Sequence, residues 1–249
     1  MRLLCWNIQH GGGVRRARIV EEITAYDPDA IALTAFRAKP GASLRADLCA
    51  DLGERGWDHC ETTDPPENRN GIAVFSRSAI RRARPCLAPP GESARWLDVD
   101  LPEFGFGMAV LHIMAGGSAR NSPATVAKMR FWDAVVEAAE ARLHEPFLLV
   151  GDWNTGMHRV DESGRSFVCE GHFAKLSEMG WTDLWRHHHP GTTEFTWYWT
   201  VRGVRGNGFR VDHAFATPSL LARVKECRYS HAERDAGISD HSLAIVEIE

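Results

Sequence analysis

The sequence of residues 147–154, Phe147-Leu148-Leu149-Val150-Gly151-Asp152-Trp153-Asn154, joins an apolar run to two closely spaced polar side chains. The apolar run is too short for a helix and predicts a buried strand over Pro146–Val150. Side chains alternate between the two faces of a strand, so we expect Asp152 and Asn154 on one face. This strand would therefore deliver a carboxylate and an amide to the same side of a sheet.

Similar short runs recur along the chain, separated by turns rich in glycine and proline. They predict strands, and apolar residues at helical spacing predict helices between them. The helices interrupt the strands irregularly, which favours packed sheets with helices outside over a regular βαβ series. We expect residues 1–249 to form a single domain. Strands are expected at Arg2–Ile8, Ala30–Phe36, Gly71–Ser76, Arg95–Leu101, Gly107–Ile113, Val211–Ala216 and Leu243–Ile248, and helices at Arg15–Ala25, Leu44–Leu52, Pro123–Leu143 and His172–Met179.

The longest predicted helix has clear start signals. Ser122 is expected to cap it and Pro123 to open it. Its predicted apolar stripe consists of Val126, Met129, Trp132, Val135 and Val136.

The composition is that of a soluble globular protein. Charged residues are 25% and hydrophobic residues 44% of the 249 residues, and 29 basic against 33 acidic residues give a formal charge of −4. No apolar run approaches the roughly 20 residues of a membrane span, and Met1–Asn7 turns polar too early for a signal peptide. We therefore expect a cytoplasmic protein that does not bind membranes.

Cysteine and histidine spacing does not indicate a zinc site. The six cysteines include no C-x-x-C pair, and we expect reduced, mostly structural thiols. The side chains of the triplet His187-His188-His189 should diverge, which makes a metal cluster there a poor interpretation. The cysteines are Cys5, Cys49, Cys60, Cys86, Cys169 and Cys227.

Polar side chains stand at the ends of several predicted strands, where a rigid sheet can bring together residues distant in sequence. Taken singly, they have simpler explanations: Asn7 suits a turn, His112 resembles a core histidine, and 239–242 reads as a solvated loop. From the sequence alone these alternatives stay open. The residues are Asn7, His112, Asp152, Asn154, Asp212, Asp240 and His241.

Taken together, these side chains suit hydrolysis of a phosphate ester. Carboxylate and amide oxygens bind Mg²⁺, and the ion offsets negative charge on the phosphate and leaving oxygen. A histidine held by an aspartate can take a proton from water, and His241 and Asp212 are the candidates. Asn154 and His112 could donate hydrogen bonds to phosphate oxygens as negative charge builds up.

Six motifs in order carry a resemblance to a known family, although any one alone would be weak. The sequence resembles the endonuclease/exonuclease/phosphatase superfamily across essentially the whole chain. The resemblance implies an α/β (α+β) fold, a four-layer α/β/β/α sandwich of two packed mixed sheets flanked by helices, with Mg²⁺ or Mn²⁺ in a cleft at one edge. The motifs are Cys5-Trp6-Asn7-Ile8-Gln9, Asn70-Gly71-Ile72-Ala73-Val74-Phe75-Ser76-Arg77, Val110-Leu111-His112-Ile113, Gly151-Asp152-Trp153-Asn154, Arg210-Val211-Asp212-His213 and Ser239-Asp240-His241-Ser242.

Within the superfamily, the chain resembles the exonuclease III-type AP endonuclease branch of DNA-repair nucleases. That resemblance implies that Trp197, Phe209 and Val211 form an apolar pocket for an abasic sugar, which suits a flipped-out sugar without its base. A competing interpretation makes Trp197 and Trp199 core aromatics on one face of a strand, with Tyr198 on the other. The segments that carry this resemblance are 181–186, 189–190, 195–199 and 208–212.

Two positions depart from the family pattern. The second strand normally ends with a glutamate that ligates the metal, and Ala35 stands there instead. Alanine has no ligand atom, so metal affinity and rate should fall sharply. We interpret the chain as a Glu-to-Ala inactivated variant, suited to trapping substrate or a metal-free state. Gln9 is longer than the usual residue and is expected to shift contacts to metal-bound water.

The resemblance also implies roles for the polar residues. Asn7 and Asp240 would hold the metal, Asp152 would position or activate the attacking water, and His241 would pair with Asp212. Either Asp152 or His241 acts as the general base, and the sequence does not decide between them.

The remaining implied roles concern the substrate. Asn154 would hold the phosphate, and His112 would donate to the phosphate or the leaving group. In-line attack would leave a 3′-hydroxyl and a 5′-phosphate. Further substrate contacts are expected at Gln9, Arg37, Asn70, Arg120 and Asn121.

The resulting expectation is a monomeric, Mg²⁺-dependent hydrolase that acts on duplex DNA as an AP endonuclease or 3′-5′ exonuclease. Two alternatives stay open: a phosphodiesterase or phosphatase for small molecules or lipid headgroups, and a catalytically dead nucleic-acid-binding module.

Overall fold

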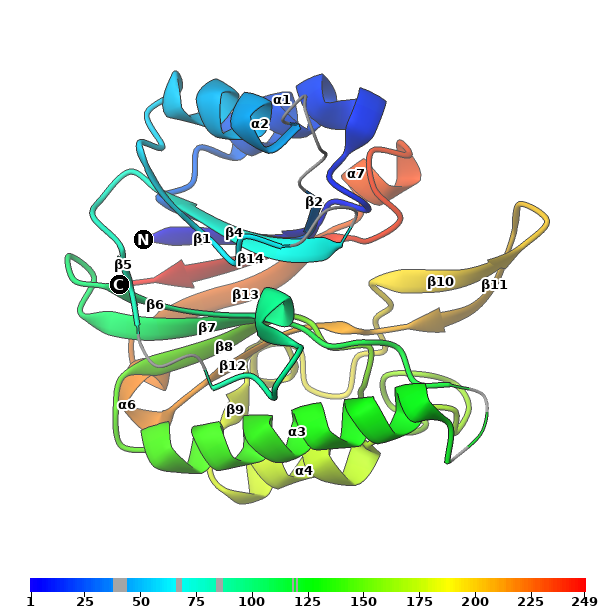
Figure 1. Cartoon of the computed structure of the whole chain (residues 1–249). Coiled ribbons are helices and arrows are strands. Elements are labelled where there is room, and N and C mark those ends of the chain that lie inside the picture. The colour runs from blue at the N-terminus through cyan, green and yellow to red at the C-terminus, as the bar shows by residue number, and fades with distance from the viewer. Residues whose placement is uncertain (38–43, 66–68, 84–86, 118, 120) are drawn as a thin grey trace.

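Two stacked sheets with helices on both outer faces make up the structure (Figure 1). The computed structural model describes residues 1–37, 44–65, 69–83, 87–117, 119 and 121–249. Within these residues each of the two main sheets has six strands, and each contains both parallel and antiparallel pairs. The expected α/β/β/α sandwich is therefore confirmed.

The first sheet has the strand order β13-β14-β1-β2-β4-β3. Its central strands β1 and β2 run parallel, and the neighbouring pairs are antiparallel. The strand bounds are β1 Arg2–Asn7, β2 Ala30–Arg37, β3 His59–Thr62, β4 Asn70–Ser76, β13 Val224–Ser230 and β14 Leu243–Ile248.

The second sheet has the order β5-β6-β7-β8-β12-β9, with β7 and β8 parallel. A separate hairpin, β10 Trp197–Val201 with β11 Val204–Phe209, extends away from the body, and both chain ends lie on the opposite side (Figure 1). The strand bounds are β5 Arg81–Arg82, β6 Trp96–Leu101, β7 Phe106–His112, β8 Phe147–Asp152, β9 Thr182–Asp183 and β12 Asp212–Ala216.

Helices cover the outer faces of both sheets. α1 and α2 lie over the first sheet, and α3 and α4 lie over the second (Figure 1). No helix in the described parts of the chain is both long and apolar enough to cross a membrane. The helices are α1 Arg16–Tyr26, α2 Leu44–Gly53, α3 Pro123–Arg142, α4 Glu170–Glu178, α5 Leu184–His188, α6 Pro218–Leu221 and α7 Ala232–Asp235, with 3₁₀ turns η1 Gly13–Arg15 and η2 Ser93–Arg95.

Alternation along the central strands explains the layers. In β1, Leu3 and Cys5 point into the core between the sheets, whereas Leu4 and Trp6 pack outward under the first helical layer. Both faces of this strand are thus apolar and buried, as a strand inside a four-layer sandwich requires. Only at the strand end does the inward sequence change from apolar residues to Asn7.

Helix α3 begins as predicted but buries a different face. The Ser122 Oγ accepts a hydrogen bond from the Thr125 backbone N–H at 3.2 Å, and Pro123 opens the helix. The predicted apolar stripe was wrong at its N-terminal end, because Val126 and Met129 are 38% and 43% exposed. Successive steps of three residues drift by about 60° around a helix, so the early positions leave the buried face. The residues buried there are Thr125, Lys128, Phe131, Trp132, Val135, Ala138 and Ala139.

A buried ion-pair network holds the segment before β12. Arg210, 1% exposed, donates from Nε to Asp161 Oδ1 at 2.7 Å and from Nη1 to Asp183 Oδ1 at 3.0 Å. Arg186 also reaches Asp161, from its Nη2 at 2.9 Å. Because Arg210 lies just before Asp212, this network fixes the backbone that leads into the second sheet.

Replacing Arg210 with methionine should lower the free energy of unfolding by about 3–5 kcal/mol, since two carboxylates would lose a buried cation. Urea denaturation would measure the loss. The matched variant Arg186→Met removes a more exposed partner and should cost on the order of 1 kcal/mol. Equal losses in the two variants would contradict a special role for Arg210.

Candidate active site

The strand register gathers polar residues at one edge of the second sheet. His112 ends β7, Asp152 ends β8 and Asp212 begins β12, and Asp152 is the cross-strand partner of both others. β12 runs antiparallel to β8, so its first residue meets the last residue of β8. Three residues that lie up to 100 positions apart thus form a row.

A hydrogen-bonded chain connects this row to the first sheet. The Asn7 Nδ2 donates to Asp152 Oδ2 at 2.8 Å and lies 3.4 Å from His241 Nε2. The His241 Nδ1 lies 2.9 Å from Asp212 Oδ2, and the His112 Nε2 lies 3.7 Å from Asp152 Oδ2. All five residues are at most 7% exposed. Five of the predicted site residues therefore converge in one buried cluster.

The loop that carries His241 is fixed to the first sheet. The Ser239 Oγ donates to the backbone carbonyl of Asn7 at 2.5 Å, and the Trp6 indole N–H donates to the carbonyl of His241 at 3.2 Å. Ser239 and Ser242 are buried. The solvated-loop interpretation of residues 239–242 was therefore wrong for three of its four residues, and only Asp240 is exposed.

Burial and neighbouring charges shift the pKa values of His241 and His112 in opposite directions. Burial alone would lower the pKa of His241, but Asp212 and Asp152 outweigh it and raise the pKa to about 10. Burial lowers the pKa of His112 to about 4. Burial, together with the nearby Asp212, also raises the pKa of Asp152 against the opposing effect of His241. At neutral pH His241 is therefore an imidazolium and His112 a neutral imidazole.

Asn154 lies beside Asp152, and several of its hydrogen-bonding groups already have partners within the protein. Its backbone N–H donates to Asp152 Oδ1 at 3.1 Å, and its side-chain Nδ2 donates to the carbonyl of Ile113 at 3.0 Å. The buried Lys128 ammonium donates to the Asn154 carbonyl. Burial lowers the pKa of Lys128 to about 8. These contacts hold the backbone of Asn154 in its left-handed conformation, with φ at 48°.

Asp240 and the hairpin form the exposed rim of the cluster. The Trp197 indole N–H donates to Asp240 Oδ2 at 3.2 Å, and the Trp197 ring lies 5.8 Å from Phe209 and 6.3 Å from His241. The core-aromatic interpretation was wrong, because Trp197 is only partly buried and Trp199 is 58% exposed. The two tryptophans do share a face of β10, with ring centroids 6.2 Å apart.

The other predicted substrate contacts differ in burial and in hydrogen bonding. Val211 is buried and 3% exposed, and the Gln9 backbone N–H donates to Asn7 Oδ1 at 2.9 Å. The Arg37 Nε donates to Asn70 Oδ1 at 2.9 Å. Asn121 is exposed just before α3. Arg120 lies outside the described residues.

The cluster offers oxygen donors, the kind of ligand that a hard divalent cation prefers. Asp152, Asp212 and His241 offer ligand atoms within 4.8 Å of one another, but His241 already faces Asp212. Asn7 and Asp240, the two ligands expected from the sequence, carry the amide and carboxylate oxygens that Mg²⁺ or Mn²⁺ prefers. Ala35 is 2% exposed and adds only a methyl group.

Sequence inspection missed one polar group at this position. The Thr34 hydroxyl, next to Ala35 and paired in register with Asn7, is fully buried without a hydrogen-bond partner among the described residues. Its neighbours in sequence are apolar, so only its place between the sheets reveals it.

The comparisons decide the family. The family model for the endonuclease/exonuclease/phosphatase family matches residues 4–241. The chain belongs to this family. No curated protein matches it.

Solved structures with the same fold cover the whole chain. A 3′-5′ exonuclease, NExo, from Neisseria meningitidis is 24% identical with a TM-score of 0.83, and both chains are covered completely. An aspartate-to-asparagine variant of the 3′ phosphatase NExo from Neisseria, bound to a product DNA hairpin, is 23% identical with a TM-score of 0.84, covering 100% of this chain and 99% of that one. An AP endonuclease from Archaeoglobus fulgidus is 18% identical with a TM-score of 0.85 and the same coverages.

In the absence of metal, His241 and His112 should contribute to the free energy of unfolding with opposite dependence on pH. The pKa of His241 is raised in the fold, so its contribution is complete below pH 6.5 and is lost as the pH rises towards 10. His241→Gln should therefore destabilise most near pH 6 and least near pH 10.

The pKa of His112 is lowered in the fold, so its contribution is present above pH 6.5 and is lost as the pH falls towards 4. The stability of His112→Gln relative to the unchanged chain should improve over that range. Urea denaturation with a chelator present would measure both profiles. Parallel pH curves for the unchanged chain and both variants would argue against these charge states.

Proposed function

We propose that this protein is a metal-dependent phosphodiester hydrolase that acts on DNA, of the AP endonuclease or 3′-5′ exonuclease type, with its activity impaired by Ala35. The observation that carries the proposal is the buried chain Asn7–Asp152–His241–Asp212, which places a carboxylate and an imidazolium at one point. A single domain of residues 1–249, monomeric and cytoplasmic, would suffice for this chemistry.

Asp152 and His241, the two ionisable groups beside the reacting phosphate, have different roles. Asp152 is the better proton acceptor, because His241 already holds a proton at neutral pH. The raised pKa of Asp152 brings it closer to the working range of a general base. The His241 imidazolium, oriented by Asp212, would stabilise negative charge on the phosphate oxygens.

Neutral His112 and Asn154 would donate hydrogen bonds to the phosphate or the leaving oxygen. Asn7 and Asp240 would hold Mg²⁺ or Mn²⁺. When bound, the ion would neutralise charge on the phosphate and the leaving group.

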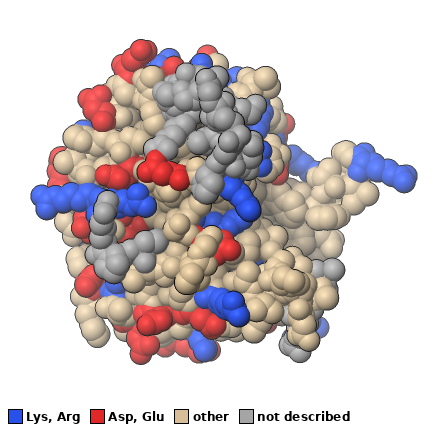
Figure 2. All heavy atoms as spheres, in the orientation of Figure 1, with Lys and Arg blue, Asp and Glu red and all other residues tan. Residues whose placement is uncertain are grey.

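DNA is supported as the substrate by the relatives and by the rim. One relative was solved with a product DNA hairpin, and another is named an AP endonuclease. Trp197 presents a partly exposed ring beside His241, and the partly exposed Phe209 ring packs next to it. An unstacked sugar or base can rest on such a surface. Acidic and basic side chains are mixed over one face, whereas the projecting hairpin carries basic atoms at its tip (Figure 2). A net charge of −4 is therefore compatible with local phosphate binding.

A catalytically dead nucleic-acid-binding module is the second candidate, and Ala35 favours it. The alanine removes one ligand but leaves the rest of the cluster intact. On this alternative the chain would bind DNA without cleaving it, whether or not a metal is supplied.

The variant Ala35→Glu should raise Mg²⁺-dependent cleavage of DNA on the order of 100-fold, since it supplies the missing carboxylate ligand. Initial rates on a labelled abasic duplex with and without chelator would measure the gain. The matched control Ala35→Gln adds similar bulk without the charge and should gain far less. No change in rate with Ala35→Glu would refute the proposed role of position 35.

A substrate panel for the Ala35→Glu variant separates the alternatives. Abasic duplex, plain duplex, single strands, RNA and a chromogenic phosphodiester would be compared at equal enzyme concentration. We expect cleavage of abasic duplex or of 3′ ends to be fastest. Cleavage of the chromogenic ester alone would favour a small-molecule phosphodiesterase, and tight DNA binding without cleavage would favour the binding module.

A further inference from the structure

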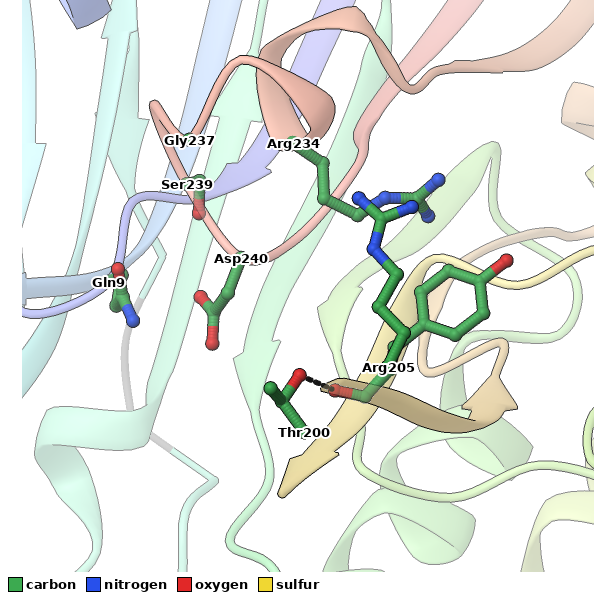
Figure 3. Close-up of a pocket in the computed structure, with 8 residues that line it drawn as sticks. Gln9, Thr200, Arg205, Arg234, Gly237, Ser239 and Asp240 are labelled. Carbon is green, nitrogen blue, oxygen red and sulfur yellow. Dashed lines mark hydrogen bonds between the residues drawn. The ribbon is translucent and has the colours of Figure 1, made fainter. Parts of the chain in front are cut away.

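A pocket of about 260 Å³ lies between the hairpin and the loop that carries Asp240. Gln9 and Asp240 line it on one side, and Arg205 and Arg234 line it on the other (Figure 3). Tyr198, which contacts both arginines, also lines it. None of these last three residues takes part in the chemistry proposed above. Asp240 lies at the rim of the catalytic cluster and also lines this pocket. A molecule held at the cluster can therefore extend into the pocket.

Two guanidinium groups are gathered at one wall of the pocket. Arg205 from β11 lies 5.1 Å from the centre of the Tyr198 ring, and Arg234 from α7 lies 4.9 Å from it. Figure 3 shows the Arg205 and Arg234 guanidinium groups next to each other. A cation over an aromatic face is attracted by the ring, so Tyr198 helps to hold the two like charges in place.

Arg234 is pre-positioned by the protein backbone. Its side chain is 8% exposed, and its Nη1 donates to the carbonyl of Phe195 at 2.7 Å and to Ser242 Oγ at 2.9 Å. Ser242 directly follows His241. The position of Arg234 is therefore tied to the same loop that carries the catalytic histidine.

One carboxylate faces the two arginines. The Asp235 Oδ1 lies 2.5 Å from Arg205 Nη2 and 3.4 Å from Arg234 Nε. The Arg205 and Asp235 side chains are 52% and 53% exposed, so water screens their ion pair and an incoming anion can replace it. Asp235 is the carboxylate paired with the two guanidinium groups at this wall, and Asp240 lies on the opposite side of the pocket.

We propose that the pocket binds the backbone phosphate next to the scissile one, so that the substrate is a nucleic-acid strand with at least two phosphates. This inference rests on the proposed function, which places the scissile phosphate at Asp152 and His241. The planar fork of a guanidinium matches the geometry of a phosphate. Contacts of this kind position a strand without reading its sequence. An ester with a single phosphate cannot occupy both places.

Fluorescence anisotropy of a labelled single-stranded oligonucleotide with the unchanged chain would test the inference. Arg205→Gln should weaken binding at least about fivefold and reduce the slope of log K against log salt by about one. Asp235→Asn should tighten binding at least twofold, because it removes the competing anion. The matched control Arg202→Gln makes the same charge change at the exposed hairpin tip, outside the pocket, and should alter affinity less than twofold.

Three results would overturn the inference. The first is equal weakening by Arg205→Gln and Arg202→Gln, which would indicate general charge attraction. The second is weaker binding by Asp235→Asn. The third is Arg205-dependent displacement of the oligonucleotide by equimolar inorganic pyrophosphate, which would assign the pocket to a small anion.

A kinetic arm separates failure of this inference from failure of the proposed function. In the Ala35→Glu background, Arg205→Gln should raise KM for the oligonucleotide at least fivefold, with the effect on KM exceeding that on kcat. An unchanged KM in an active enzyme would reject the pocket alone. An Ala35→Glu variant that cleaves no phosphodiester would reject the proposed function, and the anisotropy measurements would still decide whether the pocket binds a strand.

Discussion

The site depends on one hydrogen bond between the two sheets, from Asn7 Nδ2 to Asp152 Oδ2 at 2.8 Å. Each partner is the last residue of a strand whose preceding side chains are buried. The bond can form only if the two sheets stack with these strand ends aligned, and the apolar core between the sheets sets that alignment. An unpaired carboxylate in its place would carry the full cost of desolvation. The packing of the apolar core and the hydrogen bond to Asp152 therefore require the same alignment of the two sheets.

The charge balance of the cluster follows from this burial. Two carboxyl groups, those of Asp152 and Asp212, face one imidazolium, His241, in this cluster. A phosphate enters such a site poorly unless a cation accompanies it. A glutamate at position 35 would add a further carboxylate. Under the proposed function, Ala35 would weaken cation binding and lower the repulsion of a phosphate.

The local patterns in the sequence predicted the main elements well, because burial on both faces leaves unmistakable apolar strands. They also placed the Ser122 cap, whose hydrogen bond is made within one turn. They failed on the inner face of α3, where position relative to the sheet decides which residues are buried. They left His112 and the loop of His241 ambiguous, since a buried histidine looks the same in sequence whether it packs or reacts. The hairpin aromatics were equally ambiguous until the hairpin was seen to leave the body of the protein (Figure 1).

By itself, the sequence determined the strands, the polar residues that end them, their order along the chain and the absence of a carboxylate at position 35. These properties are local, because each depends on a few neighbouring residues and on side-chain chemistry. Only the tertiary structure decided that Asn7, His112, Asp152, Asp212 and His241 meet, that Asp240 faces outward, and that Arg205 and Arg234 share the ring of Tyr198. Those contacts join residues from different sheets and loops, and their distances are set by how the core packs.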